Sequence, residues 1–260
     1  MYAFTLERPT TTADASKLAA SGAKPLAGGQ TLLASMKLRL SSPEQLADLS
    51  GIKELVGIKR DGNAFVIGAM TRHADVAIHP ELKAAIPALA DLAANIGDRQ
   101  VRAMGTLGGS VANNDPSACY PSAVLALGAT IHTTTRKIAA EDFFLGMFTT
   151  ALNEGEIVTA VSFPIPDQAG WQKFKQPASR FSLVGVFVSK GSAGVRVAVT
   201  GAGAGGVFRA SGLEALLEAN YSAAALAGAW VPADDLNSDL HGSAAYRAAL
   251  IPVLAGRAVG

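Results

Sequence analysis

Two segments of the sequence place paired glycines beside amide or hydroxyl side chains. The first is Gly28-Gly29-Gln30-Thr31, which follows a short extended segment and precedes a helix-like stretch, Leu32–Leu40. Paired glycines permit positive φ angles and let backbone N–H groups approach a ligand without obstruction by Cβ. Several such N–H groups around a tight turn form an anion site that suits a pyrophosphate. Gln30 and Thr31 can add side-chain donors, although a plain turn has the same residues.

The second segment, Thr106-Leu107-Gly108-Gly109-Ser110, repeats this arrangement far along the chain. Polar groups follow it at Asn113, Asn114 and Asp115. Two candidate phosphate cradles so far apart predict one extended ligand that is held between two subdomains. A dinucleotide has that shape, and neither segment matches the GxxxxGK[ST] pattern of a P-loop.

A third cluster, Gly201–Gly206, matches GxGxxG and follows a strand-like stretch, Val195–Thr200. A dinucleotide fingerprint needs a helix directly after the glycines and an acidic residue further on for the ribose. Here Val207–Arg209 reads as extended chain, and Glu214 and Glu218 come too early for the ribose. We therefore interpret this cluster as a connection between two strands.

Composition excludes several classes of function. The formal net charge is +1 and the basic residues are scattered, which argues against nucleic acid as a partner. Hydrophobic residues make up 49% of the chain and charged residues 17%, as in a globular protein. No apolar stretch is long enough for a membrane span. The first residues, Met1–Pro9, lack the features of an export signal, so we expect a cytoplasmic protein.

The cysteine and histidine content restricts the redox chemistry. Cys119 is the single cysteine, so the chain has no internal disulfide and lacks the four thiolates that an iron–sulfur cluster usually needs. The four histidines show no metal-ligand spacing. If the protein does redox chemistry, its redox group must be an organic cofactor, and any metal must lie in another chain.

The pattern of apolar residues predicts alternating helices and strands. Glu81–Ile96 has the periodicity of one helix. Pro164–Gly170, with two prolines and one glycine, is the clearest domain boundary. Beyond it we expect a three-stranded antiparallel sheet and then a mostly helical tail that includes Ser222–Ala229 and Ala244–Leu254. The three strands are Trp171–Phe174, Leu183–Ser189 and Val195–Thr200.

A resemblance to a known family rests on AGGQTLLASMKLRL and IGDRQVRAMGTLGGSVANNDPSACYPSAVLALGA. Both segments resemble the FAD-binding medium subunit of the molybdenum hydroxylases. That family includes aerobic carbon monoxide dehydrogenase, xanthine dehydrogenase, and aldehyde and N-heterocycle hydroxylases. The match continues through EDFFLGMFTTALNEGEIVTAVSFPIP and KFKQPASRFSLVGVFV. The resemblance covers essentially the whole chain, in the expected order.

The resemblance implies an α+β fold of three parts. Two subdomains, residues 1–55 and 56–166, would clamp FAD in the manner of the vanillyl-alcohol oxidase (PCMH) type. Residues 167–260 would form a C-terminal domain with a three-stranded antiparallel sheet and helices. This division agrees with the Pro164–Gly170 boundary that the sequence itself predicts.

The resemblance also implies which residues contact FAD. The first loop supplies Ala27, Gly28, Gly29, Gln30, Thr31 and Leu32, and the second supplies Thr106, Gly108, Gly109 and Ser110. Ile96 and Val158 correspond to apolar contacts, and Lys175 corresponds to a basic residue near the cofactor. Cys119 stands where the family commonly has an acidic residue, and Asp115 can compensate for the lost carboxylate. No catalytic residue and no metal ligand is expected in this chain.

The implied function is electron relay between partner chains. A large subunit with a molybdopterin cofactor would oxidise the substrate, and 2Fe-2S clusters of a small subunit would pass electrons to FAD here. An external acceptor, which could be a quinone, NAD or oxygen, would then take them from a dimer of heterotrimers. Two alternatives stay open: a self-sufficient flavin oxidase of the same fold, and a non-catalytic nucleotide-binding module for assembly.

Overall fold

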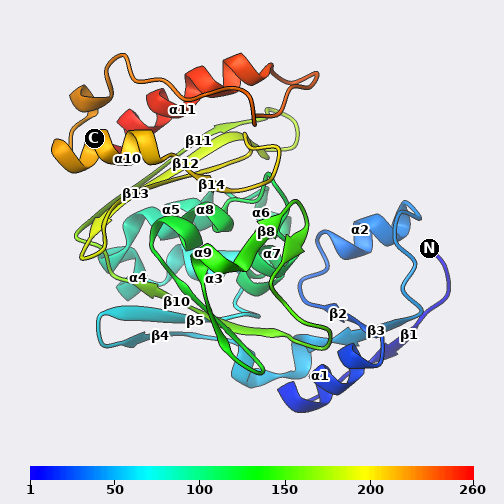
Figure 1. Ribbon diagram of the computed structural model, residues 1–260. Coiled ribbons are helices and arrows are strands. Elements are labelled where there is room, and N and C mark those ends of the chain that lie inside the picture. The colour runs from blue at the N-terminus through cyan, green and yellow to red at the C-terminus, as the bar shows by residue number, and fades with distance from the viewer.

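The computed structural model describes residues 1–260, and the chain forms three main sheets in sequence order (Figure 1). The first is a small parallel sheet of order β1-β3-β2. Its helices connect parallel strands, and the connection from β2 to α2 is the first glycine segment. The elements are β1 (Thr5–Glu7), α1 (Thr12–Ala20), β2 (Lys24–Leu26), α2 (Leu32–Lys37) and β3 (Gln45–Asp48).

Two 3₁₀ turns, η1 (Leu49–Gly51) and η2 (Lys53–Leu55), lead into an antiparallel sheet of order β4-β5-β10-β6-β7. Its strands are β4 (Ile58–Asp61), β5 (Ala64–Gly68), β6 (Thr130–Thr133), β7 (Lys137–Ala139) and β10 (Val158–Pro164). The second glycine segment opens α7 in the helical layer on this sheet. That layer contains α3 (His73–Ile78), α4 (Pro80–Ala85), α5 (Pro87–Ala94), α6 (Arg99–Met104), α7 (Leu107–Asn113), α8 (Tyr120–Ala126), α9 (Ala140–Phe143) and the hairpin of β8 (Phe144–Gly146) and β9 (Thr149–Thr150).

The expected single helix over Glu81–Ile96 is two helices. Pro87 cannot donate a backbone hydrogen bond, and its ring disfavours helical geometry at Ile86, so α4 ends there and α5 begins at Pro87. The sequence pattern is helical on both sides of the break. The apolar periodicity therefore predicted helical structure correctly, but it did not predict the break between α4 and α5 at Ile86 and Pro87.

The third sheet is antiparallel and lies between the helical layer and the C-terminal helices (Figure 1). Eight consecutive residues of β12 are buried because both faces of this strand are covered. The sheet has the three expected strands and a short fourth, β14, and the expected helix at Ser222–Ala229 is only the turn η3. The elements are β11 (Gln168–Lys175), β12 (Ser182–Gly191), β13 (Gly194–Thr200), β14 (Phe208–Arg209), α10 (Ser211–Ala219), η3 (Ala223–Leu226) and α11 (Ala244–Val259).

The Gly201–Gly206 cluster connects β13 to β14, as predicted for a strand-to-strand connection. The hydrophobic core does not stop at the predicted boundary near residue 167. Trp171, Phe187 and Ala198 of the third sheet pack into the same core as the helices of the second layer. The C-terminal part is thus joined to the middle part by buried apolar contacts, and the division into three domains stays a prediction.

No helix combines the length and the apolar content that crossing a membrane would take.

Candidate cofactor site

The structure brings the two glycine segments together. Gly28 lies directly against the end of α6, where a Cβ atom would come within 2.1 Å of the Met104 carbonyl oxygen and 2.7 Å of Gly105 Cα. A Cβ at Gly109 would lie 3.3 Å from Ala27 Cβ. These approaches are possible only because the glycines have no side chain. Two loops that are distant in sequence therefore form one continuous surface.

The first loop presents an unused set of backbone donors. None of the six N–H groups from Ala27 to Leu32 donates a hydrogen bond within the chain. Gly29 has a φ of +69°, which turns the backbone so that successive N–H groups can converge. The residues of this loop are half-buried or exposed, so the donors are accessible to a ligand. This arrangement is suited to an anion such as a pyrophosphate.

The side chains of Gln30 and Thr31 were expected to add hydrogen-bond donors for the ligand, and the structure shows Gln30 in a different role. Gln30 Nε2 donates to the Gly28 carbonyl oxygen at 3.1 Å, so this amide closes the loop and does not extend from it. Thr31 is the N-cap residue of α2, and its side chain accepts no capping hydrogen bond. The binding capacity of this loop thus lies in its backbone.

The second loop differs because its backbone donors are occupied. All four N–H groups of Leu107–Ser110 are hydrogen-bonded within the chain. The first two donate to the carbonyl oxygens of Thr71 (3.0 Å) and Ala69 (2.8 Å), and the last two donate to the hydroxyl and carbonyl oxygens of Thr106 (3.2 and 3.1 Å). Thr106 is therefore the cap of α7. These four amides are therefore not free, and the loop forms a fixed wall that carries the Ser110 hydroxyl. Contact of the second loop with the cofactor stays a prediction.

His73 packs against Gly105, directly before the second loop. No pattern in the sequence indicated this role of His73. Its backbone N–H donates to the Gly105 carbonyl oxygen at 3.0 Å, and a Cβ at Gly105 would lie 2.6 Å from its Nε2. Its ring lies 5.3 Å from the ring of Tyr120. Burial, with a smaller effect of Arg102, lowers the pKa of His73 to about 4. The imidazole is therefore neutral at ordinary pH and acts by packing.

Asn114 ends α7 and holds the β8–β9 hairpin beside the site. It adopts a left-handed conformation with φ of 44° and is almost fully buried. Its Nδ2 donates to the carbonyl oxygens of Gly146 (2.7 Å) and Thr149 (2.9 Å), and its backbone carbonyl oxygen accepts from the N–H of Phe148 (3.1 Å). The position of the hairpin therefore depends on this one residue, and two of the three hydrogen bonds come from its side chain.

Replacing Asn114 with alanine is expected to lower the free energy of unfolding by about 1–2 kcal/mol. The variant loses two hydrogen bonds to buried carbonyl oxygens and keeps an unfavourable φ. Asn113→Ala is the control, because the half-buried Asn113 side chain makes no hydrogen bond. Urea unfolding measures both variants. Equal midpoints for Asn114→Ala and the wild-type chain would contradict this role.

A second cluster of polar groups lies around Cys119, the one member of the cluster that the sequence predicted as a cofactor contact. The thiol is buried, with 5% of the residue exposed, and its Sγ lies 3.6 Å from Ser182 Oγ. Lys173 Nζ lies 3.4 Å from the same Sγ and donates to the Asn95 carbonyl oxygen at 3.0 Å. Sequence reasoning missed Lys173. The alternation of β11 was the available signal, because it places Lys173 and Trp171 on the same face.

The other residues predicted to contact the cofactor are Asp115, Ile96, Val158 and Lys175, and they lie in different environments. Asp115 accepts a hydrogen bond from Ser117 N at 2.8 Å and lines a polar cavity of about 250 Å³ beside Ser182. Ile96 is half-buried, whereas Val158 is a core residue with 4% of its surface exposed. Lys175 is exposed and makes no hydrogen bond or ion pair. Their contacts with a cofactor stay predictions.

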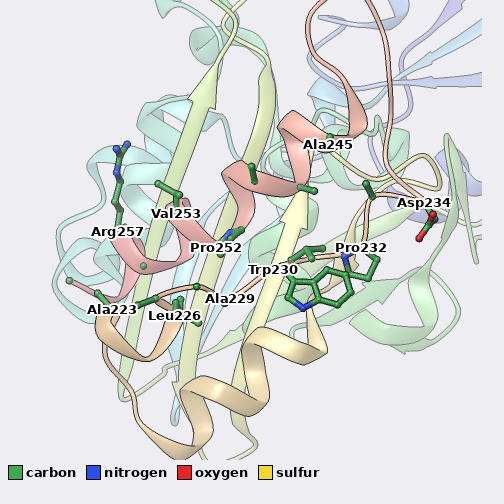
Figure 2. A pocket seen from close by; sticks show the side chains of 18 residues that line it. Ala223, Leu226, Ala229, Trp230, Pro232, Asp234, Ala245, Pro252, Val253 and Arg257 are labelled. Atoms are coloured by element: carbon green, nitrogen blue, oxygen red, sulfur yellow. The ribbon is translucent and has the colours of Figure 1, made fainter.

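A larger cavity, of about 1010 Å³, lies between α11 and residues 223–234 (Figure 2). Its walls are mostly alanine and other apolar residues, with Trp230 over one side and Arg257 at one end (Figure 2). Neither glycine loop takes part in it. Because its lining is mostly apolar and contains no residue of either glycine loop, we do not assign the cofactor to it.

The part of the chain that contains both loops matches a known protein family. Residues 2–166 match the model of a protein family described as the FAD binding domain in molybdopterin dehydrogenase. The chain belongs to this family. The residues of the first loop fit the cofactor, because six free N–H groups and a bare glycine surface suit the pyrophosphate of FAD.

Curated relatives of this family member are medium chains of several dehydrogenases. The carbon monoxide dehydrogenase medium chain of Hydrogenophaga pseudoflava is 34% identical over 254 residues, which cover 92% of this chain and 88% of that one. The glyceraldehyde dehydrogenase medium chain of Sulfolobus acidocaldarius is 38% identical over 169 residues. That match covers 63% of this chain and only 60% of the relative.

Solved structures confirm the α+β fold that the resemblance implied. Carbon monoxide dehydrogenase from Oligotropha carboxidovorans superimposes with a TM-score of 0.89 at 31% identity, covering 100% of this chain and 98% of that chain. Quinoline 2-oxidoreductase from Pseudomonas putida 86 superimposes with a TM-score of 0.88 at 28% identity, covering 99% and 96%. The similarity therefore extends past the FAD-binding domain through the C-terminal sheet and helices.

Proposed function

We propose that this chain is the FAD-carrying medium subunit of a molybdenum hydroxylase, in which it relays electrons between partner chains. The observation that carries the proposal is the run of six unpaired N–H groups from Ala27 to Leu32, set against the rigid wall of the second loop. FAD is the cofactor for which this family is named. When bound, FAD supplies the capacity to accept two electrons and release them again.

The residues of this chain bind and orient the cofactor and need not act as acids or bases. The first loop donates to the pyrophosphate, and Gly28 lets that loop meet the second one without a gap. Thr106 holds α7 in place, so the Ser110 hydroxyl is presented from a fixed helix. The cluster of Cys119, Lys173 and Ser182 forms a polar surface for another part of the cofactor.

The proposed assembly contains a small subunit with 2Fe-2S clusters and a large subunit with the molybdopterin cofactor, arranged as a dimer of heterotrimers in the cytoplasm. The small subunit would deliver electrons to FAD, and a quinone, NAD or oxygen would remove them. Support comes from the relatives, which are named as medium chains or subunits of carbon monoxide, nicotine and caffeine-oxidising enzymes. The substrate is decided in the large subunit. Carbon monoxide, an aldehyde and an N-heterocycle are the candidate classes.

The native complex tests this proposal directly. Purified through a tag on this chain, it is expected to show the visible absorption of oxidised flavin and to contain iron, molybdenum and two further chains. Flavin without metals or partners would favour a self-sufficient oxidase. Partners without flavin would favour an assembly module. Either result would overturn the proposed relay.

A further inference from the structure

Lys173 and Cys119 bring an amine and a thiol into contact inside the fold. Lys173 extends from β11 and is half-buried, and its Nζ lies 3.4 Å from Cys119 Sγ at the start of α8. The same Nζ donates to the Asn95 carbonyl oxygen at 3.0 Å, which holds the amine beside the sulfur. No carboxylate lies within 4.0 Å of this amine, because the seven ion pairs of the chain involve other residues. The nitrogen and the sulfur therefore face each other without a competing ion pair.

The Cys119 thiol has no second cysteine with which it can react. It is the single cysteine of the chain, so its oxidation cannot form an internal disulfide. An oxidised cysteine in the sulfenic acid state can instead condense with a nearby nitrogen to give a sulfenamide. The two side chains in polar contact with Sγ are Lys173 and Ser182, whose Oγ lies 3.6 Å away. Of these two, only Lys173 offers a nitrogen nucleophile.

A polar cavity gives a small oxidant a route towards the sulfur. Ser182, which contacts Sγ, lines the cavity of about 250 Å³ together with Asp115 and Ser117. Hydrogen peroxide resembles water in size and polarity, so such a cavity can admit it. It forms when oxygen, one of the candidate acceptors, takes up two electrons and two protons. The proposed electron relay can therefore supply the oxidant.

We propose that Lys173 and Cys119 form a reversible covalent switch that responds to hydrogen peroxide and weakens FAD binding. Peroxide oxidises the thiol to a sulfenic acid, and its second oxygen leaves as water. The ammonium gives one proton to solvent, its nitrogen attacks the sulfur, the S–O bond breaks and a second water leaves. One thiol, one ammonium and one peroxide thus give one N–S bond, two waters and one proton. Two thiols of an added reductant restore both side chains and become a disulfide.

The new bond changes the polar surface of Cys119, Lys173 and Ser182. Its effect on FAD rests on the proposed function, which gives this surface to the cofactor. The bond removes the positive charge of Lys173 and joins β11 covalently to the start of α8, so the surface loses a charged donor and the freedom to adjust. Losing one hydrogen bond from a charged group weakens affinity by about tenfold or more. The linked chain is therefore expected to bind FAD at least about tenfold more weakly.

Intact mass and peptide mapping of the full chain after treatment with hydrogen peroxide test the link. The wild-type chain is expected to become lighter by two hydrogen atoms and to yield peptides joined through Cys119 and Lys173. Dithiothreitol should reverse both changes. Lys173→Met and Lys173→Arg remove the amine, so their oxidation should stop at oxygen adducts of Cys119. Lys83→Met is the matched control, because the exposed Lys83 lies on α4, does not contact the thiol and should leave the link intact.

Titration with FAD before peroxide, after peroxide and after dithiothreitol measures the effect on binding. If Lys173→Met does not fold, Lys173→Arg decides the role of the amine. A loss of two hydrogen atoms that persists in these variants would place the new bond elsewhere and overturn the inference. A wild-type Cys119 that stays free or carries only oxygen would overturn it too, as would a linked chain with unchanged FAD affinity. A wild-type chain that binds no FAD before treatment would instead overturn the proposed function, while the mass measurement would still decide whether the link forms.

Discussion

Replacing Gly28 with alanine is expected to weaken the binding of FAD to the protein strongly. The added Cβ would lie 2.1 Å from the Met104 carbonyl oxygen and 2.7 Å from Gly105 Cα, and both are backbone atoms that cannot rotate away. One loop must move, which separates the six free donors from the wall of the second loop. Strain of roughly 1–3 kcal/mol from such overpacking corresponds to about a 5- to 140-fold weaker affinity.

The ratio of flavin absorption to protein absorption measures this effect, together with titration of the apoprotein with FAD. Gly205→Ala is the matched control. A Cβ at Gly205 would meet no atom within 4 Å, and its φ needs no glycine. This control also tests the GxGxxG cluster, which we interpret as a plain connection between β13 and β14. Full flavin content in Gly28→Ala, or flavin loss in Gly205→Ala, would reverse the assignment of the two segments.

Glu156→Gln is expected to destabilise the fold by about 2 kcal/mol at neutral pH. The buried carboxylate accepts hydrogen bonds from Arg136 Nε and Nη2, from Asn153 N, and from the hydroxyls of Thr133 and Thr135. A glutamine removes the charge and turns one acceptor into a donor, which leaves several of these donors unpaired. Arg136 is half-exposed, so solvent screening keeps the loss below that of a fully buried pair.

The same residue makes stability dependent on pH in a defined direction. Hydrogen bonding from Arg136, aided by Asn153, Thr133 and Thr135, outweighs burial and lowers the pKa of Glu156 from 4.5 to about 2. Because the folded pKa is depressed, the stabilisation is complete above pH 4.5 and is lost as pH falls towards 2. The difference in unfolding free energy between wild type and Glu156→Gln should therefore shrink over that interval.

Denaturant unfolding at a series of pH values checks this prediction. Glu154→Gln is the control, because Glu154 is exposed, lies two residues away and makes no hydrogen bond or ion pair. It should unfold like the wild-type chain at every pH. A difference between wild type and Glu156→Gln that stays constant from pH 7 to pH 2 would show that the carboxylate is not the source of the stability.

Strands were predictable wherever one local signal dominated. β10 ends at Pro164 and β11 begins at Gln168, inside the Pro164–Gly170 segment, and the predicted apolar runs lie in β11, β12 and β13. The tail shows the limit of such signals. Ser222–Ala229 is rich in alanine, which favours a helix in isolation, yet only η3 forms there. Helical propensity of a short segment is weak compared with the packing of the surrounding chain.

The sequence by itself determined the family and the likeness of the two glycine segments. Glycine pairs, a single cysteine and matching motifs are properties of residue order, so they can be read without coordinates. Only the tertiary structure showed that the two segments differ in the hydrogen bonding of their backbone N–H groups. The N–H groups of Ala27–Leu32 are free, whereas those of Leu107–Ser110 are occupied by Thr71, Ala69 and Thr106.

The sequence did not indicate the position of Lys173, and it left open how Cys119 contacts the cofactor. Both depend on contacts between distant parts of the chain. Whether a donor is free, or a charge has a counter-ion, depends on partners that folding brings from distant parts of the chain. Lys173 meets Asn95 and Cys119, which lie 78 and 54 residues away in the sequence. No local pattern contains that information, because hydrogen-bond partners are selected by the packing of helices and sheets.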